Sequence, residues 1–172
     1  MFTKASAEAY FNAEKSVGLF FVVVGVATIV LAAGLFFVVK TSFWKGASVP
    51  LLLLAVLQIA AGYTVYARSD AQRKDIVYKI DLNPAGIQEN EIPRMEKVMK
   101  NFARYHYVEI GLLLAGAILF FYCRKNGGQQ FWAGFGIALA LQATIMLVAD
   151  MAAAKRGKAY LTGLKHVVAP ER

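Results

Sequence analysis

The sequence contains a single cysteine, Cys123, among its 172 residues. One cysteine excludes an internal disulfide and any metal or redox site built from several cysteines. The chain also lacks the glycine-rich loop that binds phosphates and the GxSxG motif of serine hydrolases, and neither histidine is expected within reach of the cysteine. No motif in the sequence therefore indicates a particular reaction. We expect a non-enzymatic protein with no catalytic residues, no metal and no cofactor.

Charged residues are scarce in four long apolar stretches, at residues 17–39, 47–67, 103–122 and 131–154. Each is close to the roughly 20 residues that a helix needs to cross a hydrocarbon core about 30 Å thick. The first stretch is longer than the apolar part of a signal peptide, and Glu8 and Glu14 precede it, so we expect it to be retained. The sequence predicts an all-α polytopic membrane protein, with four transmembrane helices in an up-down bundle and residues 1–172 in one domain.

The positive charges are distributed unevenly along the chain. Two short connections join the first span to the second and the third span to the fourth. They contain only four of the 19 lysines and arginines, namely Lys40, Lys45, Arg124 and Lys125. The positive-inside rule therefore places both termini and the central connection in the cytoplasm, and we expect a bacterial cytoplasmic membrane. The net charge of +8 favours contacts with anionic membrane lipids over nucleic acid, because no basic soluble module remains to bind nucleic acid.

The second and third spans are predicted to continue beyond the membrane as a cytoplasmic helical hairpin at about residues 68–102. A polar helical pattern follows residue 67 and is broken only by the turn sequence Asn83-Pro84-Ala85-Gly86. A helix restarts near Glu91, with Pro93 tolerated in its first turn. The fourth span continues in the same way through 155–164. Pro50 is expected in the first turn of the second span, with Ser48 as its N-cap.

Two short segments of the chain recur. Phe43-Trp44-Lys45-Gly46 recurs as Phe131-Trp132-Ala133-Gly134, and Leu57-Gln58 recurs as Leu141-Gln142. They indicate either a parallel internal repeat or a coincidence among apolar helices with interfacial aromatic residues. Small residues also recur at helical spacing, for example Gly18 and Gly25, and these would serve packing within the chain or in a homo-oligomer.

Polar residues inside the spans are the candidate binding residues, because burying them in hydrocarbon is costly. Helical rise places two glutamines near mid-membrane and the other groups toward the cytoplasmic leaflet, where helical spacing puts several on shared faces. If these faces converge, they form a polar pocket in that leaflet. The candidate residues are Gln58, Tyr63, Tyr66, Arg68, Arg104, His106, Glu109, Gln142 and Asp150.

Glu109 is the most informative of these residues, because the apolar run that follows it is too short to span a membrane. A buried carboxylate either pairs with Arg68, Arg104 or His106, or takes up a proton. It would then be a functional acid or a structural ion pair, and in a tilted helix it would lie at the headgroups. His106, Glu109 and Asp150 suit a metal by residue type, but their spacing is not that of the HExxH motif.

The sequence leaves three functions open. The favoured one is a membrane protein whose pocket binds a small amphiphile, a lipid headgroup or a cation, as a transporter or channel subunit would. The alternative is a membrane-anchored interaction protein that docks a cytoplasmic protein partner through residues 69–101. The least favoured is a lipid-modifying enzyme that uses Glu109 or Asp150 as an acid or base beside His106.

Overall fold

Four long helices account for most of the computed structural model, which describes residues 2–168. They are α1 (Lys4–Gly34), α2 (Ser42–Leu82), α4 (Ile92–Cys123) and α5 (Gln130–Val168). Short helical segments join or extend them: η1 (Leu35–Val39), α3 (Pro84–Gly86), η2 (Ile87–Glu91) and η3 (Gly127–Gln129). Four segments built on the long helices are long and apolar enough to cross a membrane, which confirms the all-α prediction and the four candidate spans.

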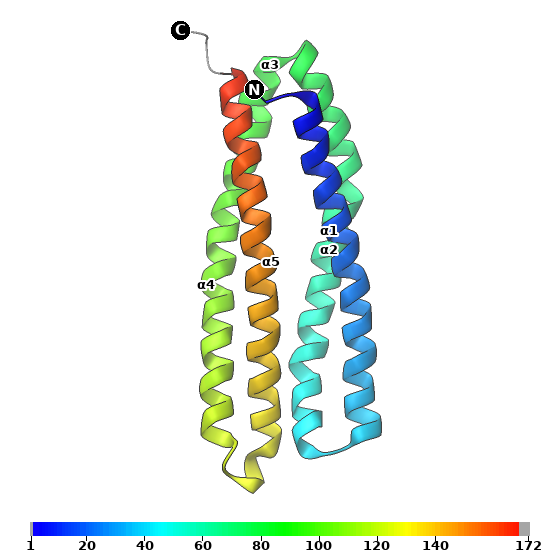
Figure 1. Cartoon of the computed structure of the whole chain (residues 1–172), viewed down its shortest axis with the longest axis vertical. Helices are drawn as coiled ribbons and strands as arrows, with labels where there is room; N and C mark the ends of the chain where they lie inside the picture. The colour runs from blue at the N-terminus through cyan, green and yellow to red at the C-terminus, as the bar shows by residue number, and fades with distance from the viewer. Residues whose placement is uncertain (1, 169–172) are drawn as a thin grey trace.

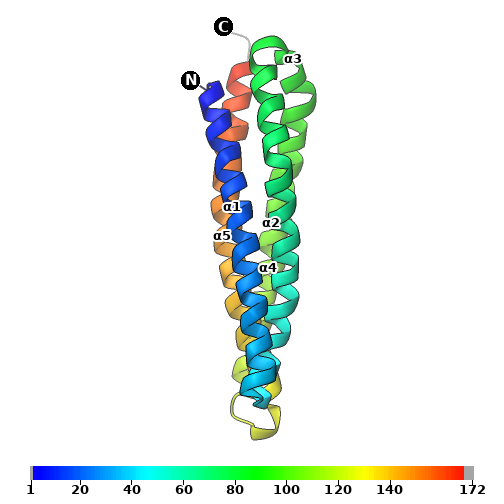
Figure 2. The ribbon, with the colours of Figure 1, turned by 90° about the vertical axis from the view of Figure 1, so that its right-hand side faces the viewer.

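The helices form a bundle that is flatter toward the end with the two short loops (Figures 1 and 2). The start of α1, the end of α5 and α3 lie at one end, called here the terminus end, and the two short loops lie at the other, the loop end (Figure 1). Toward the loop end the helices stand in the order α4, α5, α2, α1, and the view turned by 90° shows a single layer there (Figures 1 and 2).

The two middle helices are accordingly the most covered. The difference appears in the share of buried residues in the most apolar stretch of each segment. This share is 33% for α2 and 39% for the segment containing α5, against 11% and 17% for the segments containing α1 and α4. The outer helices expose large apolar side chains such as Phe20, Val30, Leu114 and Ile118. A broad apolar surface of this kind is what a lipid environment accommodates.

Local sequence signals set the helix starts. The Thr3 side chain accepts a hydrogen bond from the Ser6 amide, and Ser6 accepts one from Thr3 in return, which forms a capping box before α1. Lys40 adopts a left-handed conformation with φ of 59°, which ends the first long segment. Thr41 then caps α2 by accepting from the Trp44 amide.

The start of the second span was predicted wrongly. Pro50 lies inside α2, eight residues after the helix begins at Ser42, and Ser48 is not a cap, because its hydroxyl donates to the Lys45 carbonyl within the helix. Proline cannot donate to the carbonyl four residues earlier, that of Gly46, so one helical hydrogen bond is missing there. The helix nevertheless continues through Pro50, which is buried, as is Gly46 four residues earlier.

The helical hairpin predicted for residues 68–102 is present. Helix α2 continues to Leu82, and α4 begins at Ile92 with Pro93 in its first turn. The predicted turn at 83–86 is tighter than a loop, because Asn83 caps the short helix α3 by accepting from the Gly86 amide at 3.1 Å. The terminus end has its own apolar core, which α1 and α5 complete with Phe11 and Leu164.

Candidate functional site

The two repeated Phe-Trp-x-Gly segments meet where α2 and α5 cross near the loop end. A methyl group added to Gly46 would lie 1.9 Å from the carbonyl oxygen of Phe131, and one added to Gly134 would lie 1.8 Å from that of Phe43. Each glycine therefore packs on the backbone that begins the other segment. This reciprocal contact joins the α1–α2 hairpin to the α4–α5 hairpin.

Gln58 and Gln142 meet in the same interface, farther from the loops. The Gln142 amide donates to the Gln58 side-chain oxygen at 3.1 Å, and both side chains are buried. The Gln58 amide also donates to the Phe21 carbonyl on α1 at 3.4 Å. Each side-chain amide group therefore donates a hydrogen bond within the protein. The two glutamines can serve helix packing without a ligand.

Glu109 on α4 faces Asp150 on α5, and their carboxyl groups are close enough to interact directly. Glu109 is 5% exposed, whereas Asp150 and His106 are half-buried, and His106 lies near Asp150. Within residues 2–168, Glu109 Oε2 and His106 Nε2 are buried without a hydrogen-bond partner. None of the ion pairs in that range includes either carboxyl group. The structure therefore assembles three of the candidate residues into one group, the acid pair with its histidine.

The remaining candidate residues lie elsewhere. Tyr66 faces α1, where its ring lies under the Lys15 ammonium at 5.2 Å, and Tyr63 is 63% exposed. Arg68 and Arg104 are exposed, and Glu109 pairs with neither. The convergence of three helix faces on one pocket is therefore not what the structure shows, because α2 packs against α1 and α5 while the acids lie between α4 and α5.

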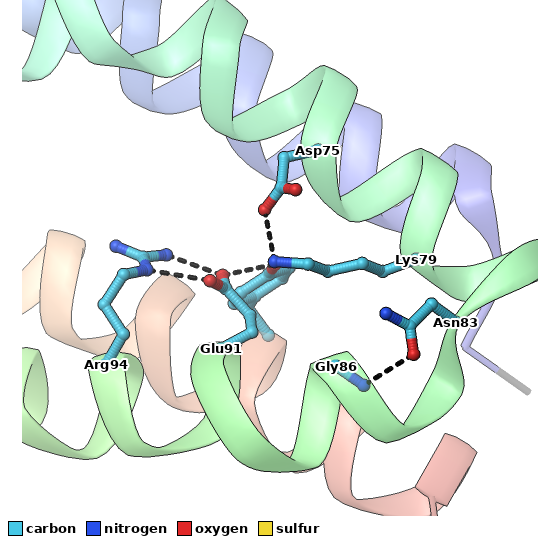
Figure 3. A network of polar contacts seen from close by, with 7 residues as sticks. Asp75, Lys79, Asn83, Gly86, Glu91 and Arg94 are labelled. Atoms are coloured by element: carbon cyan, nitrogen blue, oxygen red, sulfur yellow. Dashed lines mark hydrogen bonds and ion pairs between the residues drawn. The ribbon is translucent and has the colours of Figure 1, made fainter.

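A second polar group, at the terminus end, was missed from the sequence. Arg94 donates two hydrogen bonds to Glu91, at 2.8 Å and 2.6 Å (Figure 3). Tyr160 donates a third to Glu91 at 2.8 Å. Glu91 is only 6% exposed, and the Tyr160 ring stacks on Tyr10 with centroids 4.1 Å apart. The Glu91–Arg94 spacing of three residues was a visible signal, but the partner tyrosine comes from α5, 69 residues away.

Burial dominates the electrostatics of this group. It raises the pKa of the Tyr160 hydroxyl above its usual value, and the neighbouring Glu91 carboxylate raises it further. Burial and then Glu14 raise the pKa of Tyr10 in the same direction. At neutral pH both hydroxyls remain protonated, so Tyr160 can keep donating to Glu91. The group therefore holds α4, η2 and α5 together rather than exchanging protons.

Two cavities lie toward the terminus end. The larger, about 340 Å³, is an open groove between α1 and α5 lined mainly by aromatic and alanine side chains, with Arg156 among them. The smaller, about 60 Å³, is more enclosed and lies among α1, α2 and α4. Its lining includes Glu14, Arg68, Ser69 and Phe102. Neither cavity is lined by His106, Glu109 or Asp150.

The acid pair with its histidine does not form a metal site by geometry. No group of three or more His, Cys, Asp or Glu side chains in the described part of the chain could hold a metal ion. No protein-family model matches the sequence, and neither does any curated protein or any solved structure. The functional argument therefore depends on the geometry of the acid pair alone.

Proposed function

We propose that this chain is an integral membrane protein that binds a proton or a small cation between Glu109 and Asp150, as a subunit of a transporter or channel. We infer that both termini and α3 face the cytoplasm, because most lysines and arginines flank the terminus end of the helices. The acid pair then lies in the cytoplasmic leaflet.

The observation that carries this proposal is a buried carboxyl group facing a second carboxyl group, with no lysine or arginine paired to either among residues 2–168. Two adjacent carboxylates repel each other in a medium of low polarity, and a proton or a cation between them removes the repulsion. Acids in such positions mark ion and proton pathways in membrane proteins. His106 lies beside Asp150, next to the pair.

The position of the acid pair favours an ion over the other ligands that the sequence left open. The acid pair adjoins neither cavity, so it suits an ion better than a bulky amphiphile or a lipid headgroup. An ion-paired structural role for Glu109 is less favoured, because neither Arg68 nor Arg104 reaches it. A lipid-modifying enzyme would need room for a lipid beside the acids.

The test is proton uptake by the purified full-length protein after a pH jump, followed with a soluble pH-sensitive dye. We expect Glu109→Gln to remove one uptake step, while Glu96→Gln, an exposed acid on the same helix paired with Lys165, keeps it. Unchanged uptake in Glu109→Gln would contradict the proposal. If Glu109→Gln and Asp150→Asn both fail to fold, Glu109 is a structural residue.

The second candidate function is docking of a cytoplasmic protein partner through residues 69–101. Near its tip this hairpin exposes two large apolar side chains, Tyr78 at 60% and Leu82 at 70%, while Ile76 and Ile87 are buried in the core of the terminus end. Exposed apolar residues on a rigid support are common in binding surfaces. Tyr78→Ser with Leu82→Ser would abolish partner capture and leave proton uptake intact.

A further inference from the structure

The smaller cavity lies on the same face of α4 as the acid pair. Val98 and Phe102 line the cavity, and His106 and Glu109 follow at spacings of four and three residues. Residues at these spacings form one stripe along a helix. The stripe therefore leads from the cavity, through Phe102 and His106, to Glu109.

The cavity has several polar groups in a largely apolar lining, and it reaches the molecular surface. Glu14 on α1, Ser69 and Gln72 on α2, and Arg94 on α4 contribute polar side chains to its lining. Arg68, which also lines it, is exposed, so the cavity opens beside that side chain. A volume of about 60 Å³ with several polar partners is enough for a few water molecules.

Phe102 separates this cavity from the histidine. Its ring lines the cavity, and the ring centroids of Phe102 and His106 lie 6.5 Å apart, whereas His106 itself does not reach the cavity. Beyond Phe102, His106 Nε2 and Glu109 Oε2 are the two buried polar atoms of the stripe that have no hydrogen-bond partner within residues 2–168. Buried polar atoms in native proteins usually have partners, so both atoms are suited to receive water or an ion that passes Phe102.

We propose that the cavity is the entry route from the cytoplasm to Glu109, and that the Phe102 ring is its gate. This inference rests on the proposed binding of a proton or cation at Glu109. An ion would pass Arg68 and Ser69, wait in the cavity, where Arg156 already pairs with the Glu14 carboxylate, and reach His106 when the Phe102 ring rotates aside. Phe102 is half-buried and sits on a helix, so ring rotation needs no backbone movement.

Accessibility of cavity residues tests the first half of this proposal. In a full-length Cys123→Ala background, Ser69→Cys places a thiol in the cavity lining, and Ser48→Cys is its matched control. Both serines are buried on α2 and donate to a carbonyl of their own helix, but Ser48 lies outside the cavity. Silver ion is the probe, with protection from later maleimide labelling under denaturing conditions as the readout.

We expect silver to protect Ser69→Cys at least about tenfold faster than Ser48→Cys, because thiol reactions require access from water. Equal rates for the two variants would overturn the entry route. The gate is tested by Phe102→Ala, which should speed the Glu109-dependent proton uptake at least about tenfold without changing its amount. Phe121→Ala, an exposed phenylalanine near the other end of α4, is the control.

An unchanged uptake rate in Phe102→Ala would overturn the gate, whatever the silver result. Failure of the entry route can be distinguished from failure of the proposed function. If Glu109→Gln leaves the uptake unaltered, there is no binding site at Glu109. That result involves no cavity residue, so it contradicts the function directly.

Discussion

The α1–α2 hairpin and the α4–α5 hairpin use the same contact at different depths. In the first, Gly18 and Gly62 face each other near the middle of the molecule, and a methyl group on either would lie 2.7 Å from the carbonyl oxygen of the other. In the second, Gly116 and Gly136 make the same reciprocal contact at 2.7 Å, but toward the loop end. The acid pair of the second hairpin therefore lies on the terminus-end side of its closest helix contact.

The two hairpins also differ in the residues at corresponding positions, when positions are matched by the 84 residues that separate Gln58 from Gln142. The same separation matches Gly25 with Glu109. A methyl group on Gly25 would meet the Ile59 side chain at 2.5 Å, so the first hairpin is tightly packed and apolar where the second carries its buried acid. At this depth the first hairpin is apolar, and the second carries the acid pair. This difference indicates that the polarity of the α4–α5 interface does not follow from the fold.

The largest expected effect is the loss of the joint between the hairpins in Gly46→Ala. Its new methyl group would lie 1.9 Å from a backbone oxygen, which cannot move aside like a side chain. We expect roughly 3 kcal/mol or more of lost unfolding free energy, measured by denaturation in mixed detergent. Gly111→Ala, on α4 with nothing within 4 Å of the new methyl group, is the control and should be neutral or slightly stabilising. Equal stability of both variants would contradict the close contact.

Matched glycine substitutions in the two hairpins distinguish their roles in proton uptake. Gly62→Ala and Gly116→Ala introduce similar clashes and should each cost about 1–3 kcal/mol of unfolding free energy. Only Gly116→Ala should also change proton uptake, because it shifts α4 against α5, which carry the acids. Uptake and stability are measured on the same preparations. An equal change of uptake in Gly62→Ala would show that both hairpins contribute to the site.

Tyr160→Phe tests whether the terminus end is a structural clamp. It removes a buried hydrogen bond to Glu91 and should cost about 1–3 kcal/mol at neutral pH. Because folding raises the pKa of Tyr160, this stabilisation is present below the usual tyrosine pKa of about 10 and is lost as the pH rises above it. The wild-type protein should therefore lose stability in that alkaline range more steeply than Tyr160→Phe, in thermal unfolding followed by circular dichroism. Parallel pH profiles would contradict the clamp.

The smallest expected effect concerns the glutamine pair between the hairpins. Gln142→Leu leaves the buried Gln58 oxygen without its donor and should cost about 1 kcal/mol. The double variant Gln58→Leu with Gln142→Leu should recover part of that loss, since no unpaired amide oxygen remains. Unfolding in mixed detergent gives both values. A double variant that is less stable than the sum of the single variants would assign the pair a role beyond packing.

The spans were readable from the sequence because apolar runs of this length have few other uses, and the helical hairpin followed from the absence of helix breakers between residue 67 and Asn83. Pro50 was misplaced because proline usually begins helices, whereas here it lies buried inside α2.

Helical spacing alone predicted the candidate site only in part. It placed His106 beside Glu109, but it could not show which neighbour each helix would have in a row of four. The meeting of Glu109 with Asp150 depends on α4 packing against α5, and the exposure of Tyr63 depends on the same order. The Glu91–Tyr160 contact joins residues 69 positions apart, which no local pattern reveals.

The most direct test of a shared proton or cation at Glu109 is infrared difference spectroscopy of the full-length protein in lipid between two pH values. If Glu109 and Asp150 bind a proton between them, a band of a protonated carboxyl group should appear at the lower pH, vanish in Glu109→Gln and shift in Asp150→Asn. A band that persists unchanged in Glu109→Gln would contradict the binding site.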